Sequence, residues 1–278
     1  MHVAFRDVMR QYSLLVLLGL FLVADVEAAD IRLARSLSGA PLPGITIEGA
    51  IAPGDYQKLV ALALSSKGSH TVWLASPGGN LSEALRMGRF IRGLGFAVSV
   101  PFSKDEPLVA LKNRANNTCS SSCFLLYAAG VSRHGTVLGL HRPSLPADEY
   151  FSLGLDGAVE AYRVICDAVT AYLEEMAVPS KYTSLMLSTA NSDMVWLSSE
   201  DIRTDLDGVV AEYAERFRDV CPRRTRPDNG EYYRPVQVFS PAERLTENGD
   251  VDCVSARLQE MQEERRQIAV ARLLQERQ

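Results

Sequence analysis

Short apolar segments alternate along the chain with segments whose apolar residues recur at helical spacing. The apolar segments are rich in β-branched residues, as expected of buried strands, and lie at residues 44–51, 70–75 and 96–100. Between them, residues 55–64 and 81–91 have apolar side chains every three or four positions, which predicts helices. This alternation is typical of a layered α/β fold with a parallel sheet flanked by helices.

The same alternation continues in the second half of the chain. Residues 119–130 end in an apolar run that predicts a buried helix, and residues 136–140 predict a strand. A strong helical period predicts a long helix over residues 156–176, and another helix starts at Pro179. Residues 195–202 indicate a short edge strand that enters a capped turn.

The N-terminal residues have the three-part pattern of a secretory signal. Arg6 and Arg10 precede ten apolar residues at 14–23, and Val-Glu-Ala at 26–28 fits a cleavage site. The apolar run is shorter than the ~20 residues that a membrane-spanning helix needs. We therefore predict a signal peptide over residues 1–28, and the alternative is an uncleaved membrane anchor.

The rest of the chain divides into an α/β domain at residues 29–214 and a C-terminal extension at 215–278. Residues 217–252 are rich in Pro, Arg, Asp and Gly and indicate a loop-like connection. Residues 254–278 predict a charged helix whose apolar stripe is broken, which favours a solvated surface helix over a docking or oligomer contact.

The composition is that of a folded protein and narrows the choice of partners. Of 278 residues, 47% are hydrophobic and 23% charged, and the formal net charge is -5. An acidic balance argues against nucleic acid as a partner, because phosphate neutralisation needs clustered Lys and Arg. Five cysteines suffice for one or two disulfides, and no Cys–His cluster has the spacing of a metal site.

Two motifs follow predicted strands and open helices. Gly78 and Gly79 lie after a buried strand, where glycine lets a backbone N–H face a cleft and stabilise an oxyanion, although such a pair is more often only a turn. Asn80 and Glu83 then form a capping box for the next helix. The three serines at residues 120–122 begin an apolar helix, where a hydroxyl serves either as an N-cap or as a nucleophile.

A third motif is His141, which ends the predicted strand at residues 136–140. A lone histidine is more often a surface residue or a hydrogen-bonded core residue than a catalytic base, and we expect this of His70 and His134. His141 differs because Arg-Pro follows it and because it comes soon after the serines.

The order and spacing of these motifs resemble the ClpP-like serine peptidases of the ClpP/crotonase fold. SPGG at residues 76–79 resembles that family's oxyanion turn, and SSCFLLYAAG at 121–130 resembles the block that begins with the nucleophilic serine. LGLHRP at 138–143 resembles the strand that ends in the catalytic histidine. The resemblance covers about residues 45–213 and implies a layered parallel sheet flanked by helices. A closer likeness is to exported bacterial ClpP-like proteins with a Cys-x-Ser-x-Cys serine block.

The resemblance implies a catalytic role for three side chains. Aligned without gaps, it makes Ser121 the nucleophile and His141 the base. Asp193 matches the third catalytic residue, which fixes the histidine tautomer, but this match needs a one-residue insertion. The backbone N–H groups of Gly78 and Ser122 would form the oxyanion hole, with Gly79 in the same substrate-binding turn.

The cysteines depart from typical ClpP. Cys119 and Cys123 flank the serine block and are four residues apart, so in an oxidising compartment they can form a disulfide that rigidifies the turn or gates it by redox. The alternative is a pair of small buried thiols. We expect Cys221 and Cys253 to pair across the extension, which leaves Cys166 as a buried free thiol.

These features predict an ATP-independent serine peptidase, exported to the periplasm or secreted, that acts on short or unfolded polypeptides. No phosphate-binding P-loop is present, so no ATPase partner is implied, and no cofactor is expected. The helix at residues 156–176 takes the place of the family's protomer-contact helix, so a homo-oligomer is plausible.

Two alternatives remain open. One is a catalytically inactive binding or scaffold protein of the cell envelope that keeps the fold, since a fold does not fix a reaction. The other is a Ser-Lys mechanism, for which Lys112 and Lys181 are the lysines in suitable regions, although neither lies in a matching motif.

Overall fold

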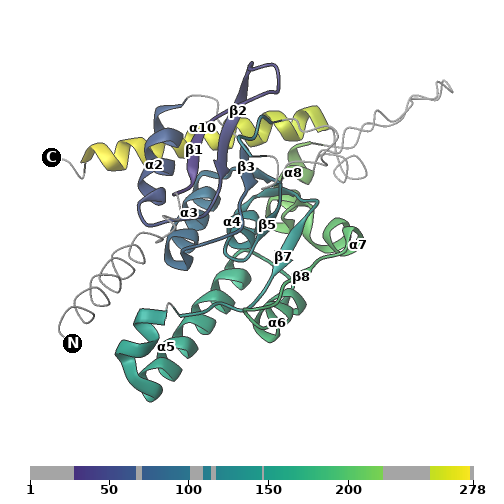
Figure 1. Ribbon diagram of the computed structural model, residues 1–278. Helices are drawn as coiled ribbons and strands as arrows, with labels where there is room; N and C mark the ends of the chain where they lie inside the picture. Colours follow the sequence, from purple (N-terminus) through teal and green to yellow (C-terminus); the bar gives the residue numbers. More distant parts are fainter. Residues whose placement is uncertain are drawn as a thin grey trace, which may run out of the picture.

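The computed structural model describes residues 28–66, 71–100, 109–113, 117–145, 147–221 and 251–275 (Figure 1). Of the predicted signal peptide only Ala28 is among them. His70 and most of the connection at residues 217–252 also lie outside the described residues.

In the part of the chain that is described, one sheet has six strands in the order β1-β2-β3-β4-β6-β9. Their bounds are β1 (Asp30–Arg35), β2 (Pro41–Glu48), β3 (Thr71–Ala75), β4 (Ala97–Ser99), β6 (Ser132–His134) and β9 (Gly208–Val209). The four central strands are parallel, while β1 and β9 run antiparallel at the edges. The expected α/β class with a mostly parallel sheet is therefore confirmed.

A second, smaller sheet contains the strands that precede Ser121 and His141. It joins β5 (Cys119–Ser120), β7 (Leu138–Leu140) and β8 (Val195–Trp196). β5 and β7 are parallel, and β8 pairs with β7 in the antiparallel direction.

Helices flank the sheets (Figure 1). They are α2 (Asp55–Ser65), α3 (Leu81–Leu94), α4 (Cys123–Ala129), α5 (Ala147–Glu175), α6 (Ser180–Ser188), α7 (Ser199–Asp201), the π-helix η2 (Ile202–Leu206), α8 (Ala211–Val220) and α10 (Val251–Gln275). α2, α3 and α6 lie where helices were predicted, whereas α5 starts before its predicted first residue, 156, and is interrupted at Gly154. The side chain of Asn80 accepts a hydrogen bond of 2.9 Å from the Glu83 N–H, which confirms the N-cap of α3. None of the described helices is long and apolar enough to cross a membrane.

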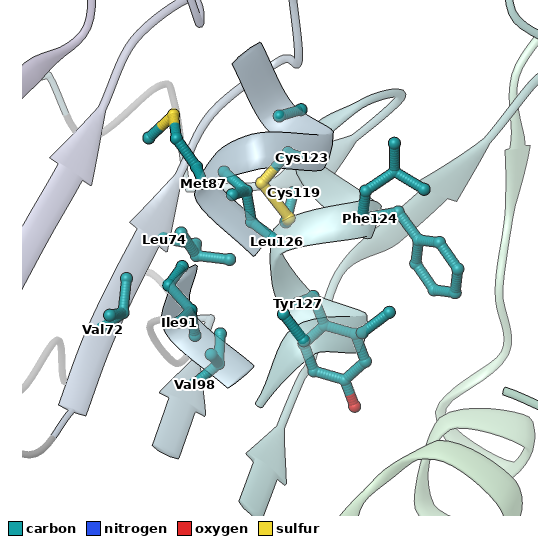
Figure 2. Close-up of a cluster of buried hydrophobic side chains, with 14 of the residues drawn as sticks. Val72, Leu74, Met87, Ile91, Val98, Cys119, Cys123, Phe124, Leu126 and Tyr127 are labelled. Carbon is teal, nitrogen blue, oxygen red and sulfur yellow. A yellow bond between two sulfur atoms is a disulfide. The ribbon is translucent and has the colours of Figure 1, made fainter. Parts of the chain in front are cut away.

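Helix α4 lies in the interior, and all seven of its residues are buried. Figure 2 shows part of the cluster around it, with side chains from β3, α3, β4 and α4. The carbonyl groups at its C-terminal end accept hydrogen bonds from Arg92, at 2.7 Å for Ala129 and 3.1 Å for Ala128. Arg133 donates to the next carbonyl, that of Gly130, and its burial lowers its pKa to about 10. These cations stabilise the negative end of the helix dipole.

The C-terminal extension is docked on the domain. Helix α10 packs against α2 and α3, and Gln262, which is only 3% exposed, donates a 2.7 Å hydrogen bond to the Gly95 carbonyl. The Cys221–Cys253 disulfide joins α10 to the end of α8, as predicted. The prediction of a solvated surface helix was therefore wrong. Polar side chains such as Gln262 make much of this contact, so the docked face has no continuous apolar stripe that the sequence could reveal.

Candidate functional site

Ser121 and His141 follow two neighbouring parallel strands. Cys119 pairs with Leu138 and Ser120 with Gly139, so β5 and β7 end side by side. The Ser121 N–H donates a 3.0 Å hydrogen bond to the Gly139 carbonyl, which continues the pairing for one more residue. Because paired strands lie about 4.8 Å apart, the residues that follow them meet at one edge of the sheet.

This edge opens into a cleft of about 760 Å³ that both Ser121 and His141 line. Most of its wall is apolar, and the polar lining residues are uncharged serines, an asparagine and the histidine. The larger apolar lining residues are Ile51, Leu81, Leu85, Leu125, Val164, Ile165, Val169 and Met186. An uncharged, apolar group therefore fits this cleft best.

The backbone of Ser121 is held in a left-handed conformation with φ 56°. A non-glycine residue in this region costs about 1–3 kcal/mol, and such strain often accompanies a functional turn. The turn connects β5 to α4, and the Cys119–Cys123 disulfide spans it with a Cα–Cα distance of 5.3 Å. Figure 2 shows this disulfide among buried apolar side chains, so of the two alternatives left open by the sequence the cysteines form the bridge.

The glycine turn packs directly on the serine turn. Gly78 has φ 97°, and a Cβ atom there would lie 2.6 Å from the Cβ of Ser121 and 2.8 Å from the Ser120 carbonyl. Only glycine fits such a contact. The Ser122 hydroxyl also donates a 3.1 Å hydrogen bond to the Gly79 carbonyl. The structure thus brings together the two turns that the sequence suggested would form an oxyanion hole.

The two expected oxyanion donors differ in their partners. The Gly78 N–H donates a 3.1 Å hydrogen bond to the Ser76 hydroxyl. No acceptor for the Ser122 N–H is found within the described residues. Gly79 and Ser122 line the cleft, whereas Gly78 is not among its lining residues. Nothing in the sequence pointed to Ser76 as a partner of the Gly78 N–H.

His141 is half-buried, and its Nδ1 lies 2.9 Å from the carbonyl oxygen of Arg142. A carbonyl oxygen only accepts, so Nδ1 carries the proton and donates to it. This tautomer leaves the lone pair on Nε2, which is the form that a general base requires. The Arg142 carbonyl is a second group that the sequence analysis missed, because backbone acceptors leave no signal in residue types.

Asp193 lies between α6 and β8. The pairing of β7 with β8 ends at Leu140 and Val195; beyond it the Arg142 N–H donates a 3.0 Å hydrogen bond to the Thr189 carbonyl, and the Asp193 N–H donates one of 3.0 Å to the Ala190 carbonyl. The Asp193 side chain is exposed and accepts a 3.4 Å hydrogen bond from the Ser192 hydroxyl. Among the described residues, no hydrogen bond joins Asp193 to His141, or His141 to Ser121.

The two lysines of the alternative mechanism are engaged elsewhere. Lys181 lies 2.5 Å from a carboxylate oxygen of Asp205, and Lys112 lies 3.2 Å from one of Asp30. Neither lines the cleft. Cys166 has no disulfide and is half-buried, which corrects the expectation of a buried thiol. Within the described ranges, no three His, Cys, Asp or Glu side chains are placed to hold a metal ion.

Neither the protein-family models nor the curated proteins that we compared with this chain give a match. Its function is therefore inferred from the geometry of the cleft and from the motifs that line it.

Proposed function

We propose that this protein is an ATP-independent serine hydrolase of the ClpP/crotonase type that cleaves short or unfolded polypeptides outside the cytoplasm. The observation that carries the proposal is the turn at Ser121. Its strained backbone presents the serine at the end of β5, against Gly78 and in the same cleft as His141.

In the proposed acyl transfer, His141 acts as the base, Ser121 as the nucleophile, and two backbone N–H groups as the oxyanion hole. Nε2 of His141 takes the proton of the Ser121 hydroxyl as the serine oxygen attacks the carbonyl carbon of the substrate. The oxyanion that forms accepts hydrogen bonds from the backbone N–H groups of Gly78 and Ser122. His141 then gives the proton to the departing amine, and water releases the acyl group from Ser121 by the same steps in reverse order.

The orientation of His141 has two candidate partners. In the triad form of the proposal, Asp193 accepts the Nδ1 proton and offsets the charge of the imidazolium. That form requires the ring or the loop to move, because the Arg142 carbonyl takes this proton in the structure. We favour a Ser121–His141 pair that the Arg142 carbonyl orients, with Asp193 contributing at most weakly.

The apolar wall of the cleft favours substrates that have an apolar side chain next to the bond that is cut. The lining residues from α5 and α6 are apolar, as are Leu81 and Leu85 of α3, and no Asp, Glu, Lys or Arg lines the cleft. Burying a charged side chain there without a partner is costly, so charged residues are disfavoured at this position of the substrate.

The two disulfides fit an oxidising compartment. Together with the signal pattern of residues 1–28, they support export to the periplasm or the medium.

Exposed apolar side chains on α5 support the proposed homo-oligomer. Phe151 is 81% and Leu155 71% exposed, although both are large and apolar. Side chains of this kind are frequently covered by another copy of the chain.

One observation favours the alternative of a binding or scaffold protein. The Gly78 N–H is bonded to Ser76, and the described residues show no hydrogen bond between Ser121 and His141. A protein that only binds polypeptides in the cleft needs neither a free Gly78 N–H nor a hydrogen bond between Ser121 and His141.

A fluorophosphonate probe separates these functions, because it reacts with serine hydroxyls that a base activates. We expect the folded, oxidised protein to be labelled, and Ser121→Ala and His141→Ala to abolish labelling. Ser188→Ala, on the exposed side of α6, is the matched control and leaves labelling unchanged. Absence of labelling in the folded wild type would favour the binding protein.

A further inference from the structure

The backbone nitrogen of Ala29 lies against a buried carboxylate. It donates a 3.2 Å hydrogen bond to Oδ2 of Asp55, the first residue of α2. Ala29 is 3% exposed and Asp55 is 0% exposed, so water has little access to this contact.

Asp55 connects this nitrogen to the wall of the cleft. The same Oδ2 accepts a 2.8 Å hydrogen bond from the Ala52 N–H, and Ala52 lines the cleft together with Ile51 and Pro53. The other oxygen, Oδ1, pairs at 2.8 Å with Lys58, whose side chain is half exposed. A change of charge at Ala29 therefore acts on the carboxylate that holds the wall at Ala52.

The signal pattern places the cut at this same nitrogen. Val-Glu-Ala at residues 26–28 puts the cleaved bond between Ala28 and Ala29. A leader peptidase adds one water across that bond. Ala28 leaves as a carboxylate with the leader, and the Ala29 nitrogen becomes an α-ammonium group, which is protonated at neutral pH.

We propose that removal of the leader after Ala28 creates a buried ion pair between the Ala29 α-ammonium and Asp55, and that this pair holds residues 51–53 against the cleft. The precursor has only a neutral N–H at this position, whereas the processed chain has a cation, and hydrogen bonds between charged groups are stronger. Maturation thus stabilises one wall of the cleft, whatever reaction takes place there.

The first test identifies the N-terminus that cells produce. The full chain is expressed in a bacterium with an oxidising periplasm, and the exported protein is analysed by intact mass and N-terminal sequencing. We expect a chain that begins at Ala29. A chain that begins at any other residue, including an uncut one, overturns the proposal.

The second test compares the chain that begins at Ala29 with a matched chain that begins at Glu27, both released from a cleavable fusion. At neutral pH an acylating reagent modifies the α-amine of Ala29 in the shorter chain at least about tenfold more slowly than the α-amine of Glu27 in the longer chain. This ratio corresponds to about 1.4 kcal/mol. The Tm of the Ala29 chain is roughly 2–4 °C higher. Asp55→Asn removes both differences.

Equal acylation rates and equal Tm values in the two chains overturn the ion pair. If Asp55→Asn does not fold, the comparison of the two chains still decides, because it leaves Asp55 unchanged. None of these measurements requires chemistry at Ser121. Failure of the serine hydrolase proposal is therefore distinguishable from failure of this one.

Discussion

At the scale of single residues, the site depends on one glycine that cannot be replaced. Gly78 has a left-handed backbone and approaches Ser121 more closely than any side chain would allow. The sequence showed a Pro-Gly-Gly turn, which is common, but it could not show which chain segment the glycine contacts. That contact joins residues more than forty positions apart and exists only after the two sheets have formed.

Gly78→Ala tests this contact. The new methyl group collides with Ser121 and strains the backbone, so we expect a loss of about 2–4 kcal/mol of stability and of fluorophosphonate labelling. Gly93→Ala is the control, because Gly93 lies on the exposed face of α3 with nothing within 4 Å of a new Cβ. It should keep labelling and gain up to about 1 kcal/mol. Urea unfolding and labelling rates measure both effects.

Asp193→Ala tests the orientation of His141. Because the Arg142 carbonyl already accepts the Nδ1 proton, we expect the labelling rate constant to fall by no more than about threefold, equivalent to less than 1 kcal/mol. His141→Ala should abolish labelling in the same assay. A loss for Asp193→Ala as large as that for His141→Ala would make Asp193 the third catalytic residue.

At the scale of elements, the disulfide between Cys119 and Cys123 holds the turn that presents Ser121. The spacing of the cysteines allowed this bridge but left two buried thiols as the alternative. Sequence reasoning placed α4 correctly as a buried helix, because an apolar run without polar positions has no face for water. Strand β6 was missed, because its three residues, Ser-Arg-His, give no apolar signal and its central Arg133 is buried through hydrogen bonds to carbonyl groups.

The two disulfides provide a matched pair of variants. Cys119→Ala with Cys123→Ala removes a disulfide that closes a short loop and contributes about 2 kcal/mol to stability. The strained turn at Ser121 is then free to relax, so labelling should fall at least about tenfold. Cys221→Ala with Cys253→Ala removes a disulfide that closes a longer loop and contributes about 4 kcal/mol to stability. Neither cysteine lines the cleft, so labelling should persist. Equal labelling in both double variants would show that the first disulfide does not support the serine turn.

A polar cluster joins α4, β6 and the end of η2. Asp207 accepts hydrogen bonds of 2.7 Å from the Tyr127 hydroxyl and 2.8 Å from the Gly135 N–H, and His134 Nδ1 lies 3.3 Å from it. Burial lowers the pKa of His134 to about 4, from an ordinary value near 6.5. The expectation of a hydrogen-bonded core histidine therefore describes His134 well.

This lowered pKa makes stability depend on pH in a defined window. Between pH 6.5 and 4 the unfolded chain takes up a proton at His134 that the folded protein does not, so the free energy of unfolding decreases as the pH falls. The contribution of His134 is fully present above pH 6.5. His134→Asn should flatten this slope in urea titrations at successive pH values, and an unchanged slope would contradict it.

At the scale of the whole molecule, the sequence predicted the α/β class and the strand–helix alternation from residue 44 to residue 100, because one strong period marks each segment. It did not predict the antiparallel edge strand β1, whose charged residues interrupt the apolar pattern. The docking of α10 was also missed. Arg266 donates to the Leu64 carbonyl and Gln262 to that of Gly95, and such contacts depend on tertiary structure alone.

The central claim is that Ser121 is a nucleophile that the fold activates. Peptide mapping by mass spectrometry after reaction with a fluorophosphonate probe tests it most directly. We predict one phosphonyl adduct per chain, on Ser121 and not on Ser120 or Ser122, in the oxidised protein. A folded, oxidised protein without an adduct, or with its adduct on another serine, would contradict the claim.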